Sequence, residues 1–513
     1  MPVTPTYPGL YLEELPSLAH TITAAPTSVT VFVGYSNPYG TRNFDTAVQI
    51  FSFSDYEREF GGLVASGVFD TNLGHAVNQF FLNGGSVAYV VGLRASYRDN
   101  TGAVIGPAAA PAVTIGTIVF TGREPTDLIP MRITIDNVDA EKGDITITYG
   151  SVIESYRGVS LASQLPNGDD NPMFIDSVLG TQSQLVTVAP VQAGYGNSMP
   201  TANATTVDMN LPANFATTFS PADFTAAFRA DQSLDKVQIF NLLCIPGVSD
   251  ASVVSAALAF AESKLAFVIV DPPRQAAADA SGADPAIQTL VPTIPKSPNG
   301  ALYFPYLQAT NPLTNQPMEL PPSGFVAGKF ADTDLKRGVW KAPAGLETSI
   351  ATTPGVVARG RMTNQRQGVL NPLGVNCLRT FPDAGTVIFG ARTLVTANTA
   401  FFQWRYVPVR RMALFLEQTL MNNLTWAVFE PNDRPLWIAL RNTVNDFMLG
   451  LFNQHAFQGD TPSQAFKVVC DETTTTQADI DNGIVNIIVA FRPLKPAEFV
   501  IIKISQLAGQ PQP

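Results

Sequence analysis

The chain has 513 residues, more than one hydrophobic core usually serves, so several domains are expected. Its hydrophobic content of 45% excludes a disordered protein, and only 14% of its residues are charged, against roughly 25% in typical soluble domains. A net charge of −11 argues against direct nucleic-acid binding, which needs a basic face to displace counterions from phosphates. The scarcity of charge leaves neutral surface, either for neighbouring subunits to cover or simply rich in Thr, Ser and Asn.

Cysteine usage and the termini indicate where the protein is made. Cys244, Cys377 and Cys470 are too far apart for a zinc knuckle or a redox pair, which fits synthesis in a reducing compartment. No basic residue precedes Arg42, and no apolar signal segment is present. The uncharged run 101–122 is long enough to cross a membrane, but prolines and glycines break it and its β-branched residues favour a strand. We expect a soluble protein made in the bacterial cytoplasm, without membrane insertion.

The first 28 residues predict an extended arm. They contain five prolines around a short apolar stretch, Leu10-Tyr11-Leu12. Proline fixes φ and lacks a backbone N–H donor, so this density forbids a helix and makes a free-standing hairpin unfavourable. We therefore expect residues 1–28 to form an extended arm, and the loss of residues 1–18 to cost the hydrophobic core little.

The segment 29–95 predicts the start of an α/β unit. A strand rich in β-branched residues covers 29–33, and a helix at 72–82 is stopped by two glycines before a strand at 87–93. From 96 onward, short alternating stretches are separated by Gly, Asp and Asn, which predicts an inserted antiparallel β-rich domain over 96–220. Within it, the polar, small-residue segment 187–222 is predicted to be a long surface loop.

The α/β pattern then returns and predicts a βαβ unit with buried parallel strands, because both strands are nearly continuous apolar runs. The predicted elements are a helix at 221–230, a strand at 237–245, a helix capped by Ser249 and running to Lys264, and a strand at 266–270. The following stretch, 271–350, holds many prolines and is predicted to be mainly loop.

The last 130 residues predict another unit. Apolar residues on helix 434–453 recur at steps that keep one face apolar, and such a stripe is read as core. The other predicted elements are a helix at 410–422 and strands at 426–429, 466–470, 484–491 and 499–504.

The search for catalytic or ligand-binding motifs is negative. At Gly328-Lys329, Phe330 stands where a Walker A loop needs Ser or Thr, and Ser323 stands where that loop needs its first Gly. No Gly-x-Ser-x-Gly elbow occurs. The three histidines, His20, His75 and His455, are scattered through the chain, and none has a second ligand at helical spacing.

A carboxylate-rich segment is the nearest approach to a metal site. Asp471, Glu472, Asp479 and Asp481 precede Gly483, but the ligand order and closing glutamate of an EF-hand are missing. A hairpin turn rich in Asp, Asn and Gly fits this segment better than a calcium loop. We therefore predict no catalytic residue, no cofactor and no metal ligand, and expect a protein that is not an enzyme.

Several long motifs, in the right order along the chain, resemble the phage tail-sheath protein family. The resemblance covers roughly 1–95, 145–185 and 220–505. The motifs are Tyr7-Pro8-Gly9-Leu10-Tyr11-Leu12-Glu13-Glu14, Glu154-Ser155-Tyr156, Pro321-Pro322-Ser323-Gly324, the run from Arg337 to Ala344, Gly390-Ala391-Arg392-Thr393, the run from Trp426 to Asp433, the run from Cys470 to Thr476, and Leu494-Lys495-Pro496-Ala497-Glu498-Phe499.

The resemblance implies a structural subunit of a contractile sheath, with stacked hexameric rings around an inner tube protein. It also implies baseplate and terminator or cap proteins as partners, and a place in a phage virion tail or an injection particle. The implied fold is mixed α/β and α+β and multidomain. Its divisions are an assembly arm at 1–28, a sheath core at 29–95 and 221–350, a surface-projecting insert at 96–220, a C-terminal sheath domain at 351–492, and a terminal strand and tail at 493–513.

Two segments are the candidate sites of subunit linkage. Both suit the addition of a strand to a neighbour's sheet, a contact made by backbone hydrogen bonds. They are the arm residues Tyr7, Pro8, Gly9, Leu10, Tyr11 and Leu12, and the C-terminal strand Phe499, Val500, Ile501, Ile502, Lys503 and Ile504.

Some alternatives stay open from the sequence alone. A hydrolase or glycan-binding protein could share the βαβ unit and β-rich insert, but would need a pocket of convergent polar groups. A capsid or tube subunit shares the assembly logic and lacks these motifs. The sequence does not separate a phage tail from a domesticated injection system, nor an extended sheath from a contracted one.

Overall fold

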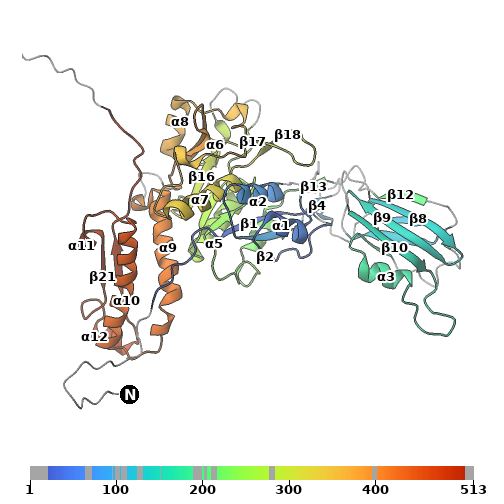
Figure 1. Ribbon diagram of the computed structural model, residues 1–513, viewed down its shortest axis with the longest axis horizontal. Helices are drawn as coiled ribbons and strands as arrows, with labels where there is room; N and C mark the ends of the chain where they lie inside the picture. The colour runs from blue at the N-terminus through green and yellow to red at the C-terminus, as the bar shows by residue number, and fades with distance from the viewer. Residues whose placement is uncertain are drawn as a thin grey trace, which may run out of the picture. The chain divides into compact units, whose positions relative to one another are not determined.

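The computed structural model describes the chain in two compact units, whose helices and strands are labelled in Figure 1. The C-terminal unit comprises Met1–Thr27, Lys336–Ala342 and Tyr406–Pro513, and the core unit comprises Ser28–Leu335 and Pro343–Arg405. The described residues are 21–37, 39–63, 72–94, 96–98, 104–105, 112–123, 131–150, 152–188, 199–200, 205–209, 216–275, 284–395 and 401–502.

The core unit is built on an eight-stranded sheet in the order β2-β3-β1-β14-β15-β16-β19-β20. The pairings from β3 through β19 are parallel, and the two outermost strands pair antiparallel. The strands are β1 (Thr30–Tyr35), β2 (Ala47–Ile50), β3 (Ala88–Leu93), β14 (Leu242–Cys244), β15 (Phe267–Val270), β16 (Gly300–Phe304), β19 (Val375–Phe381) and β20 (Gly385–Phe389).

Helices cover both faces of this sheet, which explains why its central strands are apolar on both sides. On β1, Val31 and Val33 share a core with residues of α4 and α5, whereas Phe32 packs edge-on against Phe80 of α2. The predicted βαβ unit is confirmed, although the side-chain cap of α5 is Asp250 and not Ser249. The helices are α1 (Phe53–Phe60), α2 (Asn72–Leu82), α4 (Pro221–Ala227), α5 (Ala251–Ser263), α6 (Pro285–Leu290), α7 (Ser323–Arg337) and α8 (Asn364–Leu370).

The prediction of loop over 271–350 is wrong. This stretch contains the central strand β16, helices α6 and α7, and the hairpin of β17 (Leu307–Thr310) and β18 (Pro317–Leu320). Its prolines lie at element boundaries: Pro285 opens α6, and Pro305 directly follows β16. Proline is tolerated in a helix's first turn and between elements, so its abundance did not indicate loop.

The insert is antiparallel, as predicted, and has its own apolar core of alternating inward residues. In the pairing of β8 with β9, for example, Ile133 lies opposite Ile147. The predicted loop at 187–222 is partly strand, since it includes β12 and β13. The elements are β4 (Ser96–Arg98), β5 (Val104–Ile105), β6 (Ala112–Ile115), β7 (Ile118–Gly122), β8 (Met131–Asp139), β9 (Lys142–Tyr149), β10 (Val152–Ser160), α3 (Ile175–Gln182), β11 (Val186–Val188), β12 (Thr205–Met209) and β13 (Ala216–Thr218).

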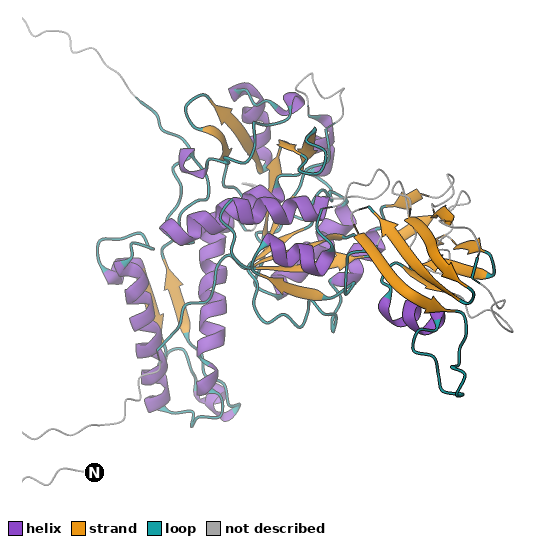
Figure 2. Ribbon diagram, turned by 45° about the vertical axis from the view of Figure 1, so that its right-hand side comes forward, coloured by secondary structure: helices purple, strands orange, loops and turns teal. Residues whose placement is uncertain are grey.

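In the C-terminal unit, the long helices α9 (Val407–Asn423) and α10 (Arg434–Asn453) run side by side with a two-stranded hairpin against them (Figure 2). Met412 of α9, Met448 of α10 and Phe466 of the hairpin belong to one core. The predicted apolar stripe of α10 lies in this unit's cores, as expected. The remaining elements are α11 (Pro462–Ala465), β21 (Phe466–Val469), α12 (Gln477–Asp481) and β22 (Ile488–Phe491).

Three details of this region differ from the predictions. Residues 426–429 are not a strand, because Thr425–Ala427 form a 3₁₀ turn, and the strand expected from 484 begins only at Ile488. The C-terminal sheath domain was expected to begin at 351, whereas β19 and β20 belong to the core sheet. The mixed, multidomain fold class itself is confirmed.

Candidate subunit-linking site

The two predicted linking segments belong to the same unit, although they lie at opposite ends of the sequence. Residues 7–12 are outside the described residues, as are Lys503 and Ile504. The structure describes Phe499–Ile502, which lie outside any helix or strand. The C-terminal unit therefore holds the described part of the C-terminal candidate and the residues that follow the arm.

Residues 21–27, the end of the predicted arm, are held along α9. The backbone of Thr23 makes two hydrogen bonds to the side-chain amide of Asn423, at 2.9 and 2.8 Å. One turn earlier on α9, the Thr419 hydroxyl accepts a hydrogen bond from the Ala25 N–H at 3.1 Å. Arg411 donates to the carbonyl oxygen of Thr27 at 2.8 Å. These hydrogen bonds anchor residues 23–27 on α9.

Sequence reasoning missed this anchor, because residues 1–28 were predicted only to be an extended assembly arm. A signal was present: Thr419 and Asn423 are polar residues four positions apart on a largely apolar helix. That spacing places both side chains on one face of α9, where they meet an extended backbone.

The C-terminal segment is held as far as Glu498 and is exposed beyond it. The Gln458 N–H donates to the Arg492 carbonyl at 2.9 Å, and the Tyr406 hydroxyl donates to a carboxylate oxygen of Glu498 at 3.4 Å. The next four residues, Phe499–Ile502, are large and apolar, and each is between 73% and 81% exposed. Such a run in water is an aggregation hazard unless a partner covers it.

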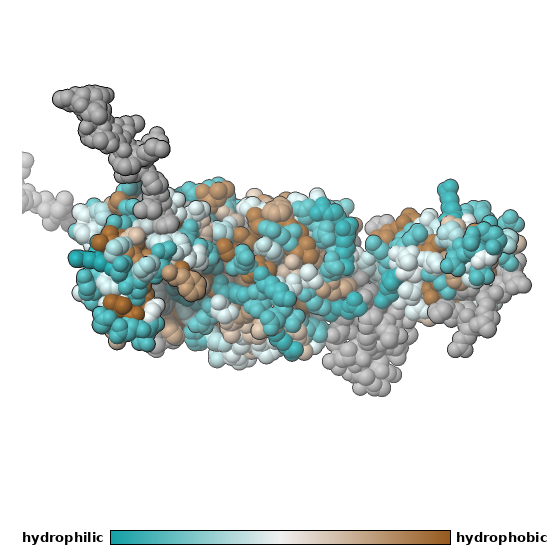
Figure 3. Space-filling view, turned by 90° about the horizontal axis from the view of Figure 1, so that it is seen from below, coloured by the Kyte–Doolittle hydropathy of each residue, from teal (hydrophilic) through white to brown (hydrophobic). Residues whose placement is uncertain are grey.

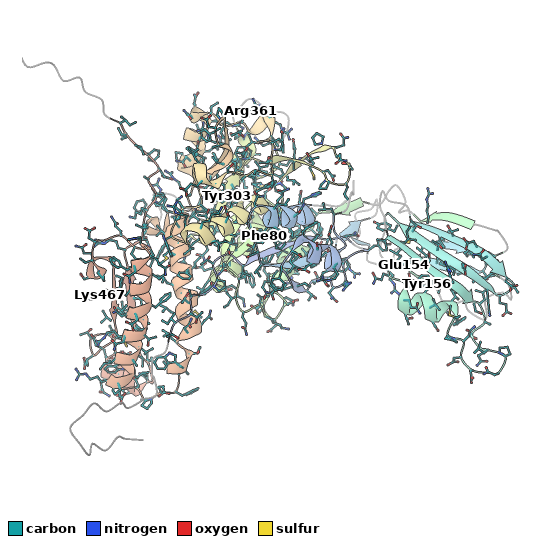
Figure 4. The ribbon with its side chains drawn as sticks, viewed as in Figure 1. Phe80, Glu154, Tyr156, Tyr303, Arg361 and Lys467 are labelled. Carbon is teal, nitrogen blue, oxygen red and sulfur yellow. The ribbon has the colours of Figure 1, made fainter. Side chains whose placement is uncertain are left out.

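The β21–β22 hairpin forms a sheet of its own with no third strand among the described residues. Its register runs from Phe466 opposite Phe491 to Val469 opposite Ile488, and one face packs on the core shared by α9 and α10. No described strand pairs with the outer edge of β21 or β22, and a sheet edge of this kind can accept another strand. Lys467 is exposed on β21 (Figure 4), and Ile488 on β22 is 54% exposed.

Exposed apolar side chains mark the surface of this unit in several places, and Figure 3 shows brown patches among the polar surface on its left side. The 3₁₀ turn is followed by Val428 and by Phe429, whose side chain is fully exposed. Phe429 also has a φ of 71°, which is uncommon for a bulky residue. Val428 and Phe429 thus add to the exposed apolar surface that Phe499–Ile502 form in this unit.

The carboxylates between β21 and β22 have structural roles. The hydroxyl and backbone N–H of Thr473 hold the pKa of Asp471 below its usual value, and those of Thr476 do the same for Asp479. Thr476 and Asp479 form a capping box at the start of α12, so this segment is a capped helix and not the simple turn expected. Over the described ranges, no group of His, Cys, Asp and Glu side chains is arranged to hold a metal ion.

The structure also describes the surroundings of one histidine and the apolar character of the helices. His75 is buried in α2, and burial lowers its pKa to about 4, so its imidazole is neutral near pH 7. Within the part of the chain that the structure describes, none of the helices combines the length and apolar character that a membrane crossing requires.

Comparison with known proteins identifies the family. The model for the phage tail sheath protein central domain matches residues 221–394, and that for the phage tail sheath C-terminal domain matches residues 402–506, together more than half of the chain. A tail sheath protein of Vibrio phage KVP40 is 23% identical over 183 residues, covering 36% of this chain and 26% of that protein. A putative prophage major tail sheath protein of Pseudomonas aeruginosa UCBPP-PA14 is 28% identical over 201 residues, covering 38% of this chain and 48% of that one. The chain thus spans about half or less of the length of these relatives.

Solved structures share the whole fold. The anti-feeding prophage baseplate contains a chain with a TM-score of 0.58 and 23% identity, over 98% of this chain and 99% of that one. The contracted sheath complex of an extracellular contractile injection system, PVC, gives a TM-score of 0.58 at 22% identity, over 98% of both chains. A sheath tail protein of Desulfitobacterium hafniense gives 0.57 at 13% identity, over 95% of this chain and all of that one. The chain therefore belongs to the phage tail sheath protein family.

Proposed function

We propose that this protein is the subunit of a contractile sheath, which polymerises as stacked hexameric rings around an inner tube and contracts to drive the tube through a target envelope. The observation that carries the proposal is a combination of structural features in the C-terminal unit. It combines an open two-stranded sheet with both chain ends, one of which presents four exposed apolar residues.

The linkage follows from this combination. Residues 499–504 of one subunit, and the arm residues 7–12 of another, add as strands to the open edges of the β21–β22 hairpin of a neighbour. Each backbone hydrogen bond contributes on the order of 1 kcal/mol net, so a few of them give a modest link per subunit that is multiplied along the polymer. Because the donated strand and the accepting edge are different surfaces, the contact does not close on itself and can generate a helix.

The energy for contraction is stored in the lattice itself. An extended lattice that is metastable and held by a kinetic barrier releases its free energy cooperatively once contraction begins. The partners in this proposal are further copies of the chain, an inner tube protein, a baseplate and a terminator or cap protein, with no direct nucleic-acid contact and no membrane insertion. The insert at 96–220 projects from the outer surface, and the protein acts without enzymatic activity in a virion tail or an injection particle.

Negative-stain microscopy of the purified full-length protein tests the proposal. Helical tubes with a ring repeat and a hollow bore are expected. Particles that remain monomeric across a wide range of concentration and salt would argue against a sheath subunit. Turnover of a generic ester, glycoside or nucleotide substrate by such particles would favour the alternative of a hydrolase or glycan-binding protein.

A further inference from the structure

A cluster of arginines on the core unit is short of carboxylate partners. Arg274 and Arg359 both donate to the same oxygen of Glu319, at 3.2 and 2.7 Å. Arg361 is exposed and forms no ion pair with any described residue (Figure 4). The Nε of Arg359 is buried and has no hydrogen-bond partner in the described part of the chain. Two guanidinium groups thus share one carboxylate, and the exposed Arg361 follows Arg359 by two residues, which leaves positive charge here on a chain whose net charge is −11.

The cluster is held in place by buried contacts beneath it. Arg366 pairs with both carboxylate oxygens of Asp284 and also donates to the carbonyl oxygens of Arg359 and Arg361, at 2.8 and 2.9 Å. Gly360 packs so closely that a Cβ there would lie 2.4 Å from Cγ of Pro305. These contacts fix the backbone that carries Arg359 and Arg361, so little backbone conformational entropy is lost when a partner binds there.

The insert carries the opposite charge. Residues 96–220 contain twelve Asp and Glu against five Lys and Arg, which is most of the net negative charge of the chain. Within it, residues 163–170 form an exposed hairpin with two adjacent carboxylates at one end of the turn, Asp169 and Asp170. The Leu165 N–H donates to the Asp169 carbonyl at 2.8 Å, and Gly168 at φ 88° closes the turn. No described cation pairs with either carboxylate, and Asp169 accepts only from the neighbouring Asn167 amide among the described side chains.

We propose that the acidic hairpin 163–170 of one subunit docks on the arginine cluster of Arg274, Arg359 and Arg361 of a neighbouring copy. The inference rests on the proposed function, since it requires copies that lie side by side in a polymer. Hydrogen bonds between a guanidinium and a carboxylate are strengthened by the opposite charges. The planar guanidinium presents several N–H donors in a fixed geometry, so the pair also fixes the orientation of the two partners. Among the described residues, no hydrogen bond or ion pair joins hairpin and cluster within one chain.

This contact adds a second kind of link to the assembly. Hairpin and cluster are different surfaces of the same chain, so the contact is heterologous and propagates along the polymer without closing a dimer. Because it is electrostatic, it is weakened by salt, unlike strand addition in the C-terminal unit. It also positions one subunit's insert on the core of its neighbour while the remainder of the insert stays on the outside.

Charge exchange tests the proposal. Arg361→Glu and Asp170→Lys each place like charges opposite one another, and each should raise the protein concentration needed for tube formation about tenfold. The combined variant restores an attractive pair and should return that concentration to within about twofold of the unmodified protein, as a double-mutant cycle requires for a direct contact. The readouts are pelleting assays at low and high salt, with microscopy of the pellets.

Two controls separate loss of the proposed contact from a general effect of charge and from loss of folding. Arg229→Glu changes an exposed arginine elsewhere on the core by the same charge and should leave assembly unchanged. If Arg361→Glu lowers the melting temperature, the neutral variants Arg361→Gln and Asp170→Asn are used in place of the charge-reversal variants. Each should raise the protein concentration needed for tube formation by less than the charge reversals do. Single variants that assemble like the unmodified protein, or a combined variant no better than the singles, overturn the inference while leaving the proposed function intact. Failure of the unmodified protein to form tubes counts against the proposed function instead.

Discussion

The core unit covers one edge of its sheet with its own chain, whereas no described strand covers either edge of the two-stranded sheet in the C-terminal unit. Along β20, residues 345–350 complete the edge: the Gly345 N–H donates to the Ile388 carbonyl at 2.8 Å, and the Ile350 N–H donates to the Thr386 carbonyl at 2.7 Å. Along the β21–β22 hairpin, no described residue plays this part. An edge that is already hydrogen-bonded cannot accept a foreign strand, and an open one can.

The contrast separates folding from assembly. The core unit buries large aromatic side chains, and its own residues 345–350 hydrogen-bond along the β20 edge of its sheet. Over the described residues, the C-terminal unit presents a two-stranded sheet and an exposed apolar tail, which neighbouring copies cover in the proposed assembly. A sheath that is to contract needs parts of both kinds: rigid bodies that move, and links that persist while they move.

The largest effect is expected from breaking the exposed tail. Ile502→Pro removes one ladder donor and bends the strand, yet Ile502 is 80% exposed and makes no core contact. The variant should melt at the same temperature as the unmodified protein and form no tubes. Ile502→Val keeps the β-branched shape and should assemble normally. Normal tubes of the proline variant, contracting as usual, would falsify strand donation by this end of the chain.

Deletion of residues 1–18 should also abolish tube formation, and it should change the melting temperature of the protein little. The deletion stops short of the segment that Asn423 and Thr419 hold, so the anchor on α9 remains. Circular dichroism during heating reports folding, and pelleting reports assembly. A melting temperature well below that of the full chain, or aggregation, would show that the arm belongs to the core of its own subunit.

A change inside the core unit should do the reverse and cost stability. Gly324 of α7 lies against α2, where an added Cβ would lie 2.4 Å from the Ala76 carbonyl oxygen. Gly324→Ala should destabilise the core unit by about 1–3 kcal/mol, because overpacking forces the helices apart. Gly368→Ala in α8 meets no atom within 4 Å and serves as the matched control, expected to be neutral or slightly stabilising. Equal denaturation midpoints for the two variants would contradict this packing argument.

Opening the covered edge should have the smallest effect. The Thr348 hydroxyl donates to the Gly345 carbonyl at 2.7 Å and accepts from the Ile388 N–H at 3.2 Å. Thr348→Val leaves that buried N–H without its acceptor and should lower the free energy of unfolding by about 1–2 kcal/mol. Amide hydrogen exchange at the Ile388 N–H should become faster in this variant. Thr289→Val is the control, because the Thr289 hydroxyl is exposed, and it should leave that exchange rate unchanged. Unchanged exchange at Ile388 would mean that residues 345–350 cover β20 without this hydroxyl.

Sequence alone determined the elements with a strong period. The bounds predicted for helices 72–82 and 434–453 coincide with α2 and α10, because an apolar stripe and helix-stopping residues are local signals. The antiparallel character of the insert and the βαβ unit also followed from periodicity and run length. The family could also be predicted from the sequence, because several long motifs occur in the same order as in tail-sheath proteins.

Tertiary structure alone decided the features that depend on distant partners. Strand β16 was taken for loop because its flanking prolines resemble loop punctuation, and only its pairing with β15 and β19 makes it central. Likewise, nothing local distinguishes the covered edge of β20 from the open edge of β22, or shows that Thr23 lies against Asn423, 400 positions later in the chain. Periodicity reports which face of a segment is buried, but backbone hydrogen bonding between segments is settled only when the chain has folded.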